Sequence, residues 1–371
     1  MLKDAAYWIS LAHLPRWRTA RTNEVIIKFH HTDKISIEEF FSLDTGVWEK
    51  EYGLNEKEIG DLTNAKSDIP NNSFLAETLE NQGFELIPIT SDDYSQTLKD
   101  NLKVNYSPPL LYIKGDKQIF TEKSIAVVGS RSASAKSLQF TDNIAKLASK
   151  EFKVIVSGFA KGVDKQALDS SIKHIGRSII VLPQGILTFG KGYQEYYKQI
   201  VNGEVVVLST FHPNAPWMVE LAMARNPIIY GLASEIYVAE SDEKGGTWSG
   251  VKDGLRKGRK IYVRMADAEE RNANGKLIEL GAMAVDFDGK VLEESATLKE
   301  NRESFDDSLR KIIAGDILSA KEIASRLNTG WTSRKMAEYL KTMTWVEEVK
   351  IKNATKYKLK PVDGTEQVGL F

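Results

Sequence analysis

Cysteine is absent from the 371-residue chain, so disulfides, thiolate metal sites and cysteine nucleophiles are excluded. A reducing cytoplasm is the compartment that this composition predicts. No apolar run reaches the roughly 18 residues that a membrane helix needs, and the N-terminal residues lack the apolar core and cleavage site of a secretory signal. We therefore expect no membrane partner. An excess of one charge is also missing, because 50 Lys and Arg face 51 Asp and Glu, so any surface that binds nucleic acid must be local.

Several familiar motifs are missing as well. No G-x-G-x-x-G follows the first predicted strand of the central region, and no G-x-x-x-x-G-K-[ST] occurs, which argues against a standard NAD site and against P-loop chemistry. G-x-S-x-G and H-E-x-x-H are absent too. The five histidines are scattered, and Asp164 is interpreted as a structural partner at the start of a helix. The sequence thus predicts no metal, no cofactor and no catalytic constellation.

The central region alternates between apolar strand-like runs and helix-like segments. The strand-like runs are 125–129, 153–158, 178–185, 204–209, 235–240 and 260–264, and the helix-like segments are 134–150, 163–175, 193–202, 217–225 and 247–258. Strands that are apolar throughout and separated by helices are typical of a parallel sheet covered on both faces. The sequence therefore predicts an α/β protein with a Rossmann-like, doubly wound and mostly parallel sheet.

Two further units flank this sheet. Residues 1–82 show helical spacing and predict an N-terminal helical domain, and 83–290 form the Rossmann-like domain. Residues 291–311 are charged and weakly patterned and are interpreted as a linker that is partly helical. Residues 312–371 hold two amphipathic segments and two strand-like runs, the order of a winged helix. Ten Lys and Arg against four Glu between positions 317 and 360 favour a DNA contact there, although a solvated face or a protein contact is the alternative.

The ends of the predicted strands carry the residues most suited to binding an anion. Ligands of parallel α/β sheets bind beyond the carboxyl ends of the strands. Glycines admit backbone N–H groups, hydroxyls donate hydrogen bonds, and Arg and Lys supply charge. The residues that meet these needs are Gly129, Ser130, Arg131, Ser157, Gly158, Lys161, Gly162, Lys244, Gly245, Gly246 and Thr247. We interpret them as one phosphate-binding edge; the alternatives are ordinary turns, and a helix N-cap at Gly246-Thr247.

These motifs resemble those of the DNA-processing protein A family, also called Smf, from about residue 84 to 264. The family's Gly-Ser-Arg loop is matched by 129–131, and its Ser-Gly-x-Ala-x-Gly-(Ile/Val)-Asp motif by 157–164. Its Arg-Asn before an Ile-Ile and Gly-Leu run is similar to Arg225-Asn226 and the residues that follow. The resemblance adds Arg225 and Asn226 to the expected DNA-binding residues.

The resemblance implies a single-stranded DNA-binding recombination mediator that is not an enzyme. It further implies a homodimer that helps to load a RecA-type recombinase in DNA uptake or recombination. A positively charged groove that follows the strand backbone is consistent with such a role.

Two other functions stay open at this point. One is a nucleotide-binding or nucleotide-cleaving enzyme resembling phosphoribohydrolases, whose motif is Pro-Gly-Gly-x-Gly-Thr-x-x-Glu; here Gly250 stands where the glutamate would be. The other is a transcription regulator that binds duplex DNA through the winged helix. Titration with single strands, duplexes and mononucleotides would separate the three.

Overall fold

The N-terminal unit consists of short helices that pack around aromatic side chains. The structure, a computed structural model, describes residues 4–341, 343, 345–351 and 354–360, with the side chains of 294–303 excepted. The helices are α1 (Ala5–Ala12), α2 (Thr19–Ile26), the π-helix η1 (Ile27–Thr32), α3 (Ile37–Ser42), α4 (Thr45–Tyr52), α5 (Glu56–Ser67) and α6 (Ile69–Asn81). Capping boxes start α3 and α5 and satisfy their first backbone N–H groups. Phe29, Phe40 and Trp48 are fully buried and belong to the same core as one face of the central sheet.

The central sheet has nine strands in the order β1-β2-β6-β5-β4-β3-β7-β8-β9. Their bounds are β1 (Glu85–Pro88), β2 (Leu110–Lys114), β3 (Ser124–Val128), β4 (Val154–Ser157), β5 (Ser178–Val181), β6 (Val205–Ser209), β7 (Glu235–Val238), β8 (Ile261–Arg264) and β9 (Met283–Val285). The pairs β1–β2 and β2–β6 are antiparallel, and all other pairs are parallel. The predicted doubly wound, mostly parallel sheet is thus confirmed, with an antiparallel extension on one side.

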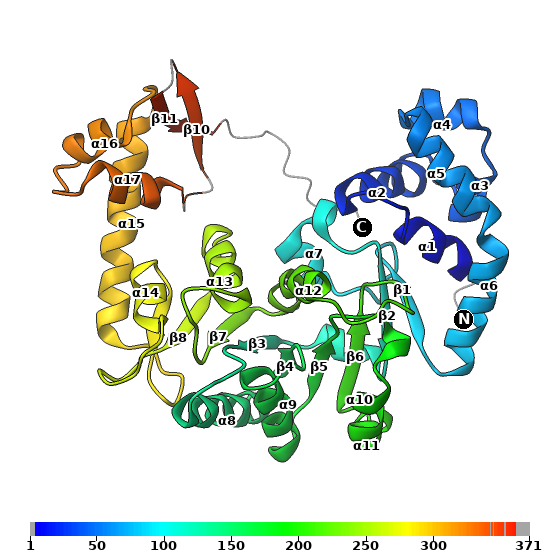
Figure 1. Cartoon of the computed structure of the whole chain (residues 1–371), viewed down its shortest axis with the longest axis horizontal. Coiled ribbons are helices and arrows are strands. Elements are labelled where there is room, and N and C mark those ends of the chain that lie inside the picture. The colour runs from blue at the N-terminus through cyan, green and yellow to red at the C-terminus, as the bar shows by residue number, and fades with distance from the viewer. Residues whose placement is uncertain (1–3, 342, 344, 352–353, 361–371) are drawn as a thin grey trace.

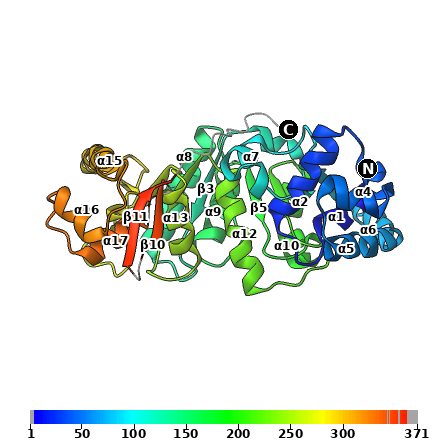
Figure 2. The ribbon, with the colours of Figure 1, turned by 90° about the horizontal axis from the view of Figure 1, so that it is seen from above.

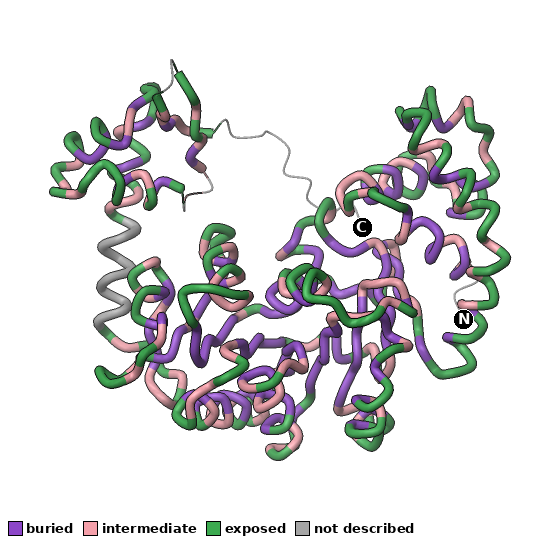
Figure 3. Tube along the Cα trace, in the orientation of Figure 1, coloured by how far each residue is buried: buried purple, intermediate pink, exposed green. Residues whose placement is uncertain are grey.

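Helices cover both faces of this sheet (Figure 1). They are α7 (Gln96–Leu102), α8 (Ala135–Lys150), α9 (Val163–Lys173), α10 (Gly190–Glu195), α11 (Tyr197–Val201), α12 (Val219–Leu232), α13 (Gly246–Arg256) and α14 (Asn274–Glu279), with the 3-10 turns η2 (Val104–Tyr106), η3 (Lys117–Thr121) and η4 (Ile186–Thr188). Along β3, Ile125 and Val127 pack toward α8 and α9, whereas Ala126 and Val128 belong to the core on the opposite face. This alternation explains why the central strands are apolar throughout, and Figure 3 shows them as buried.

Helix α12 extends further than the sequence predicts. The expected helix ends near residue 225, but α12 continues through Pro227 to Leu232. Ile228, Ile229 and Leu232 are buried against the sheet, and this burial outweighs the hydrogen bond that proline removes.

The C-terminal unit has its own core. It comprises α15 (Glu293–Ile313), α16 (Ala320–Arg326), α17 (Ser333–Leu340) and the antiparallel hairpin of β10 (Val346–Ile351) and β11 (Ala354–Leu359). The segment 291–311, expected as a linker, is therefore mostly a helix. Its last turns pack into the unit, where Leu309 and Ile313 are buried, because apolar residues four positions apart share one helix face. One end of the hairpin faces the C-terminal end of α13, since Val346 and Lys360 line a cavity together with Arg256 (Figures 1 and 2). Within the described residues, no helix is both long and apolar enough to cross a membrane.

Candidate nucleic-acid interface

The predicted site residues lie at the point where the strand order of the sheet reverses. The chain runs from β3 through β4, β5 and β6 in one direction, and then continues from β7 to β9 on the other side of β3. β4 and β7 therefore both pair in parallel with β3, and their carboxyl ends lie at one edge. We call the loops that follow these three strands, 129–132, 158–162 and 241–247, the switch-point loops. A doubly wound sheet places its ligand crevice at such a reversal.

Backbone hydrogen bonds join the switch-point loops. The N–H of Ser130 donates to the carbonyl of Glu240 at 2.9 Å, and the N–H of Val163 donates to the carbonyl of Ser130 at 3.2 Å. The hydroxyl of Thr247 donates to the carbonyl of Gly129 at 3.2 Å. The prediction that these loops share one edge of the sheet is correct.

Two glycines let these loops pack against one another. A Cβ on Gly129 would lie 2.6 Å from Val163 Cγ2, and one on Gly162 would lie 2.3 Å from the carbonyl oxygen of Ser130. Gly162 also has φ of +80°, a conformation that glycine adopts without strain. We expected these glycines to admit an anion, but the structure assigns them to loop–loop contacts. Gly245, by contrast, is exposed, with no atom within 4 Å of its Cβ position.

Three cations remain free at this edge. Arg131, Lys161 and Lys244 are exposed, and their side chains form no hydrogen bond or ion pair within the described part of the chain. Arg131 does act through space on Asp164, since its positive charge works to lower the pKa of that carboxyl. The three cations come from three different loops at the crevice. Charges in this state are the ones that can contact a phosphate without first breaking a protein contact.

Arg225 is not such a group, which corrects the expectation drawn from the sequence. Its side chain is buried, Nη1 donates to the carbonyl of Val181 at 3.1 Å, and the same atom lies 3.9 Å from Asp164 Oδ2. A Cβ on Gly158 would lie only 1.4 Å from Arg225 Nη1, so the guanidinium occupies the space that the glycine leaves. Arg225 thus supports the loop after β4 from beneath.

Burial dominates the electrostatics of the Arg225–Asp164 pair. Burial raises the pKa of Asp164, while Arg225 and the backbone N–H groups of Ala160 and Gly158 work in the opposite direction. Burial likewise lowers the pKa of Arg225, and Asp164 offsets part of that change. Each charge offsets part of the free-energy cost of burying the other, as in other buried ion pairs. Asp164 is a structural partner, as the sequence predicts.

Some of the remaining predicted side chains make internal hydrogen bonds, and others lie closer to the surface. Ser157 is fully buried and donates its hydroxyl to the carbonyl of Val127 at 2.9 Å, so the expectation that this hydroxyl faces a ligand is wrong. The hydroxyl of Ser130 accepts a bond from the N–H of Ser132 at 3.1 Å. Asn226 is half-buried, and its amide nitrogen lies 2.8 Å from the Cβ position of Gly246, which explains the glycine there.

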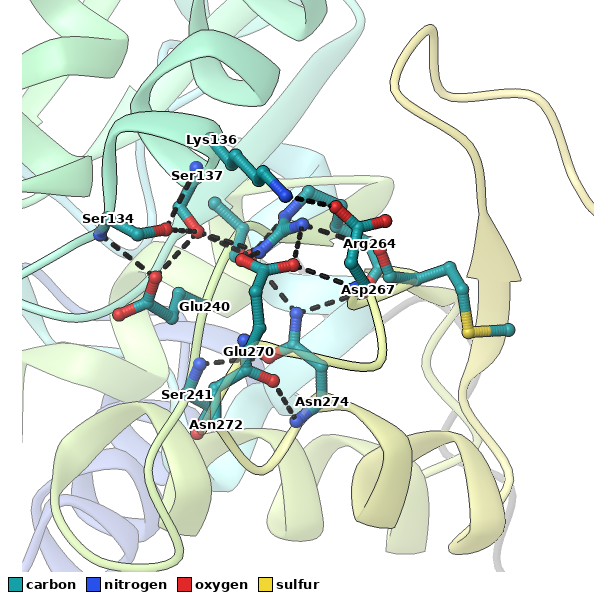
Figure 4. A network of polar contacts seen from close by, with 12 residues as sticks. Ser134, Lys136, Ser137, Glu240, Ser241, Arg264, Asp267, Glu270, Asn272 and Asn274 are labelled. Atoms are coloured by element: carbon teal, nitrogen blue, oxygen red, sulfur yellow. Dashed lines mark hydrogen bonds and ion pairs between the residues drawn. The ribbon is translucent and has the colours of Figure 1, made fainter.

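A polar network beneath the loops was not predicted from the sequence (Figure 4). Arg264 at the end of β8 is fully buried and donates to Ser137 Oγ at 2.9 Å and to Glu270 Oε1 at 2.7 Å. These bonds to Arg264 are the main cause that lowers the pKa of Glu270 to about 2. Glu240 accepts from the N–H of Ser134 at 2.9 Å and from Ser137 Oγ at 2.7 Å. The network fixes the start of α8 against the ends of β7 and β8. The only feature of the sequence that pointed to it is Arg264, a charged residue at the end of an apolar strand.

The comparisons with known proteins agree with this architecture. Residues 85–296, more than half of the chain, match the sequence profile of a family described as DNA recombination-mediator protein A. The chain belongs to this family. The DNA processing protein DprA of Bacillus subtilis is 32% identical over 221 residues, covering 57% of this chain and 72% of that protein. The DprA of Streptococcus pneumoniae is 28% identical over 217 residues, covering 58% of this chain and 76% of that protein.

A solved structure extends the match to the fold. The X-ray structure of the Streptococcus pneumoniae DprA superposes with a TM-score of 0.63 at 22% identity, covering 79% of this chain and 96% of that chain. All switch-point loops lie within the residues that match the DNA recombination-mediator family.

Proposed function

We propose that the chain binds single-stranded DNA at the switch-point loops and passes it to a RecA-type recombinase. The observation that carries this proposal is that three exposed cations, Arg131, Lys161 and Lys244, lie at the sheet reversal of a chain of the recombination-mediator family and form no ion pair with any residue that the structure describes. Phosphates of a single strand bind such cations without regard to base sequence. We further propose that the protein acts as a homodimer and works without catalysing a reaction.

One feature of α13 supports binding over nucleotide cleavage. In the phosphoribohydrolase motif a glutamate would stand at position 250. A Cβ on Gly250 would lie 2.7 Å from Tyr230 Cε2, so a longer side chain has no room there. This contact favours a site that holds phosphates over one that hydrolyses a nucleotide.

A titration with three ligands tests the proposal. Fluorescent poly-dT, the matching duplex and a set of mononucleotides would be titrated with the full chain across a range of salt concentrations. We expect the single strand to bind more tightly than the duplex, with affinity falling steeply as salt rises. Tighter binding of a mononucleotide would overturn the proposal in favour of the enzyme, and duplex preference would favour the regulator.

Dimerisation and recombinase loading need separate measurements. Light scattering of the purified chain should give twice the mass of one chain. Order-of-addition assays should show faster filament formation by a RecA-type protein when this chain has first coated the strand. A monomeric mass, or no effect on filament formation, would each remove that part of the proposal and leave single-strand binding intact.

A further inference from the structure

A groove leads away from the switch-point loops along α13. It has a volume of about 280 Å³ and begins beside Asn226 and Gly246, next to the loop that carries Lys244. Met223 and Pro227 of α12 give it an apolar wall. Gly246 and Gly250 stand one turn apart on α13 and let it pack closely against α12, since a Cβ would lie 2.8 Å from Asn226 Nδ2 or 2.7 Å from Tyr230 Cε2. Both glycines line the groove beside this contact.

Polar groups without partners line this groove. The hydroxyl of Tyr230 is buried, although a buried hydroxyl ordinarily has a hydrogen-bond partner, and it has none within the described residues. The side chains of Asn226 and Ser249 also form no hydrogen bond there. A groove that combines an apolar wall with unused hydrogen-bonding groups suits a flat ligand with polar edges, such as a nucleobase.

A second cavity continues from the far end of α13. It has a volume of about 360 Å³ and lies between α13 and the C-terminal unit, with Met343 and Tyr357 among its lining residues. Asp253, Arg256 and Lys257 line both the groove and this cavity. The two hollows therefore adjoin at the C-terminal end of α13, close to the hairpin (Figure 2).

The second cavity has an excess of positive charge. Arg256 and Lys257 stand on one wall and Lys341 and Lys360 on the other, and the acidic lining residues are Asp253 and Glu348. Arg256 and Lys257 both pair with Asp253, at 3.0 and 2.8 Å, and Lys341 lies 3.9 Å from Glu348, so two carboxylates are shared among the four cations. Four cations against two carboxylates leave a net charge of +2, which favours an anionic occupant.

We propose that the groove and the cavity together carry the continuation of the single strand from the switch-point loops to the C-terminal unit. This inference rests on the proposed function, and we call the combined path the α13 track. Helix α13 has 11 residues and is therefore about 16 Å long, enough to add nucleotides to the site. Phosphates would lie near Arg256, Lys257, Lys341 and Lys360, and bases would lie against Met223 and Pro227.

Oligonucleotide length provides the test. Arg256→Gln and Lys257→Gln would be combined in one full-length variant, with Lys146→Gln and Lys150→Gln as the matched control. Lys146 and Lys150 are exposed on α8, and replacing them by glutamine removes the same amount of positive charge as the track variant. Poly-dT of about six and about 24 nucleotides would be titrated with each protein, since known single-strand sites span roughly 4–16 nucleotides.

We expect the track variant to bind the long oligonucleotide less tightly and the short one unchanged. Each phosphate contact contributes about 0.7 to the slope of log affinity against log salt concentration, so the loss of two contacts lowers the magnitude of the slope by about 1.4. For proteins that bind equally at 1 M salt, this means that the variant binds about 25-fold more weakly than wild type at 0.1 M. Lys341→Gln with Lys360→Gln, on the opposite wall, should give a similar loss, and the α8 control should give none.

The outcomes separate this inference from the proposed function. If the track variant binds the long oligonucleotide as wild type does, while Arg131→Ala still weakens the short one, the α13 track is wrong and the switch-point site stands. If Arg131→Ala and Lys161→Ala weaken neither oligonucleotide, the proposed function itself fails. If replacing the four track cations weakens the binding of a duplex more than that of a single strand, the assignment of the track to a single strand is overturned.

Discussion

Replacing Gly158 by alanine tests how the loop after β4 is supported. The new Cβ would lie 1.4 Å from Arg225 Nη1 and 2.3 Å from its Cζ, so the guanidinium has to leave its place. It would then lose the hydrogen bond to Val181, and Asp164 would stay buried with only the weaker effect of Arg131 to offset its charge. Removing one partner of a buried pair costs about 3–5 kcal/mol. For a domain of this size we expect the melting temperature to fall by roughly 6–20 °C.

The pH dependence of this loss has a definite sign. Burial raises the pKa of Asp164, and Arg225 is the main group that offsets the rise. Without the guanidinium the folded-state pKa of Asp164 moves further above its unfolded value. The cost is then present when the carboxyl is ionised, and it disappears as the pH falls through the folded pKa. The difference in unfolding free energy between wild type and Gly158→Ala should therefore be smaller at pH 5 than at pH 8.

A double-mutant cycle decides whether this explanation is correct. Thermal and urea unfolding would be measured for Gly158→Ala, Arg225→Ala and the double variant, with Gly60→Ala as control. Gly60 is exposed on α5 with open space around it, so alanine there should be neutral or stabilise by up to about 1 kcal/mol. Because both single changes disrupt the same contact, the double variant should lose much less than their sum. Additive losses would refute the reasoning.

The exposed cations, the buried His13 and the separate core of the C-terminal unit each allow a direct test. Arg131→Ala and Lys161→Ala should each reduce the slope of log affinity for single strands against log salt concentration by about 0.7, without changing the melting temperature. Unchanged slopes in both variants would show that DNA does not bind at this edge of the sheet. Burial, with His212 nearby, lowers the pKa of His13 to about 3, so stability should be full above pH 6.5 and fall by up to about 2 kcal/mol by pH 5. His13→Gln should flatten that decline in urea unfolding, and an unchanged decline would assign it to other groups. Deleting 293–371 should leave the sheet folded by circular dichroism and still able to bind a short oligonucleotide; complete loss of binding would place the main site in the C-terminal unit.

The positions of the central strands could be predicted from the sequence because they depend on a repeated pattern. The central strands are short runs rich in Val and Ile, some of them followed by glycine or serine, and helices with one apolar face lie between them. The short strand β9 could not be found in this way, since Met283–Val285 is too brief to show a period. The end of α15 could not be predicted either, because its apolar face is apparent only from the packing of Leu309 and Ile313 in the core of the C-terminal unit.

The state of most charged side chains could not be predicted from the sequence, although Asp164 was correctly interpreted as a structural partner. Arg131 and Arg225 both belong to motifs that resemble the DNA-processing family, yet one is exposed and the other is buried over Gly158. Arg264 offered only its place at the end of a strand, and its partners lie at 137 and 270. Burial of a charge depends on residues distant in sequence, and such contacts leave no local pattern.

This difference divides the candidate site into two sets with separate consequences. Arg225, Ser157 and Thr247 use their polar atoms within the protein, so changing them should act on folding and alter binding only through the shape of the loops. Arg131 and Lys161 form no hydrogen bond or ion pair with the residues that the structure describes, so changing them should alter the salt dependence of binding and leave folding intact. A residue whose replacement lowers both stability and salt slope would belong to both sets; of these five, only Arg131 has a link of that kind, through the effect of its charge on Asp164.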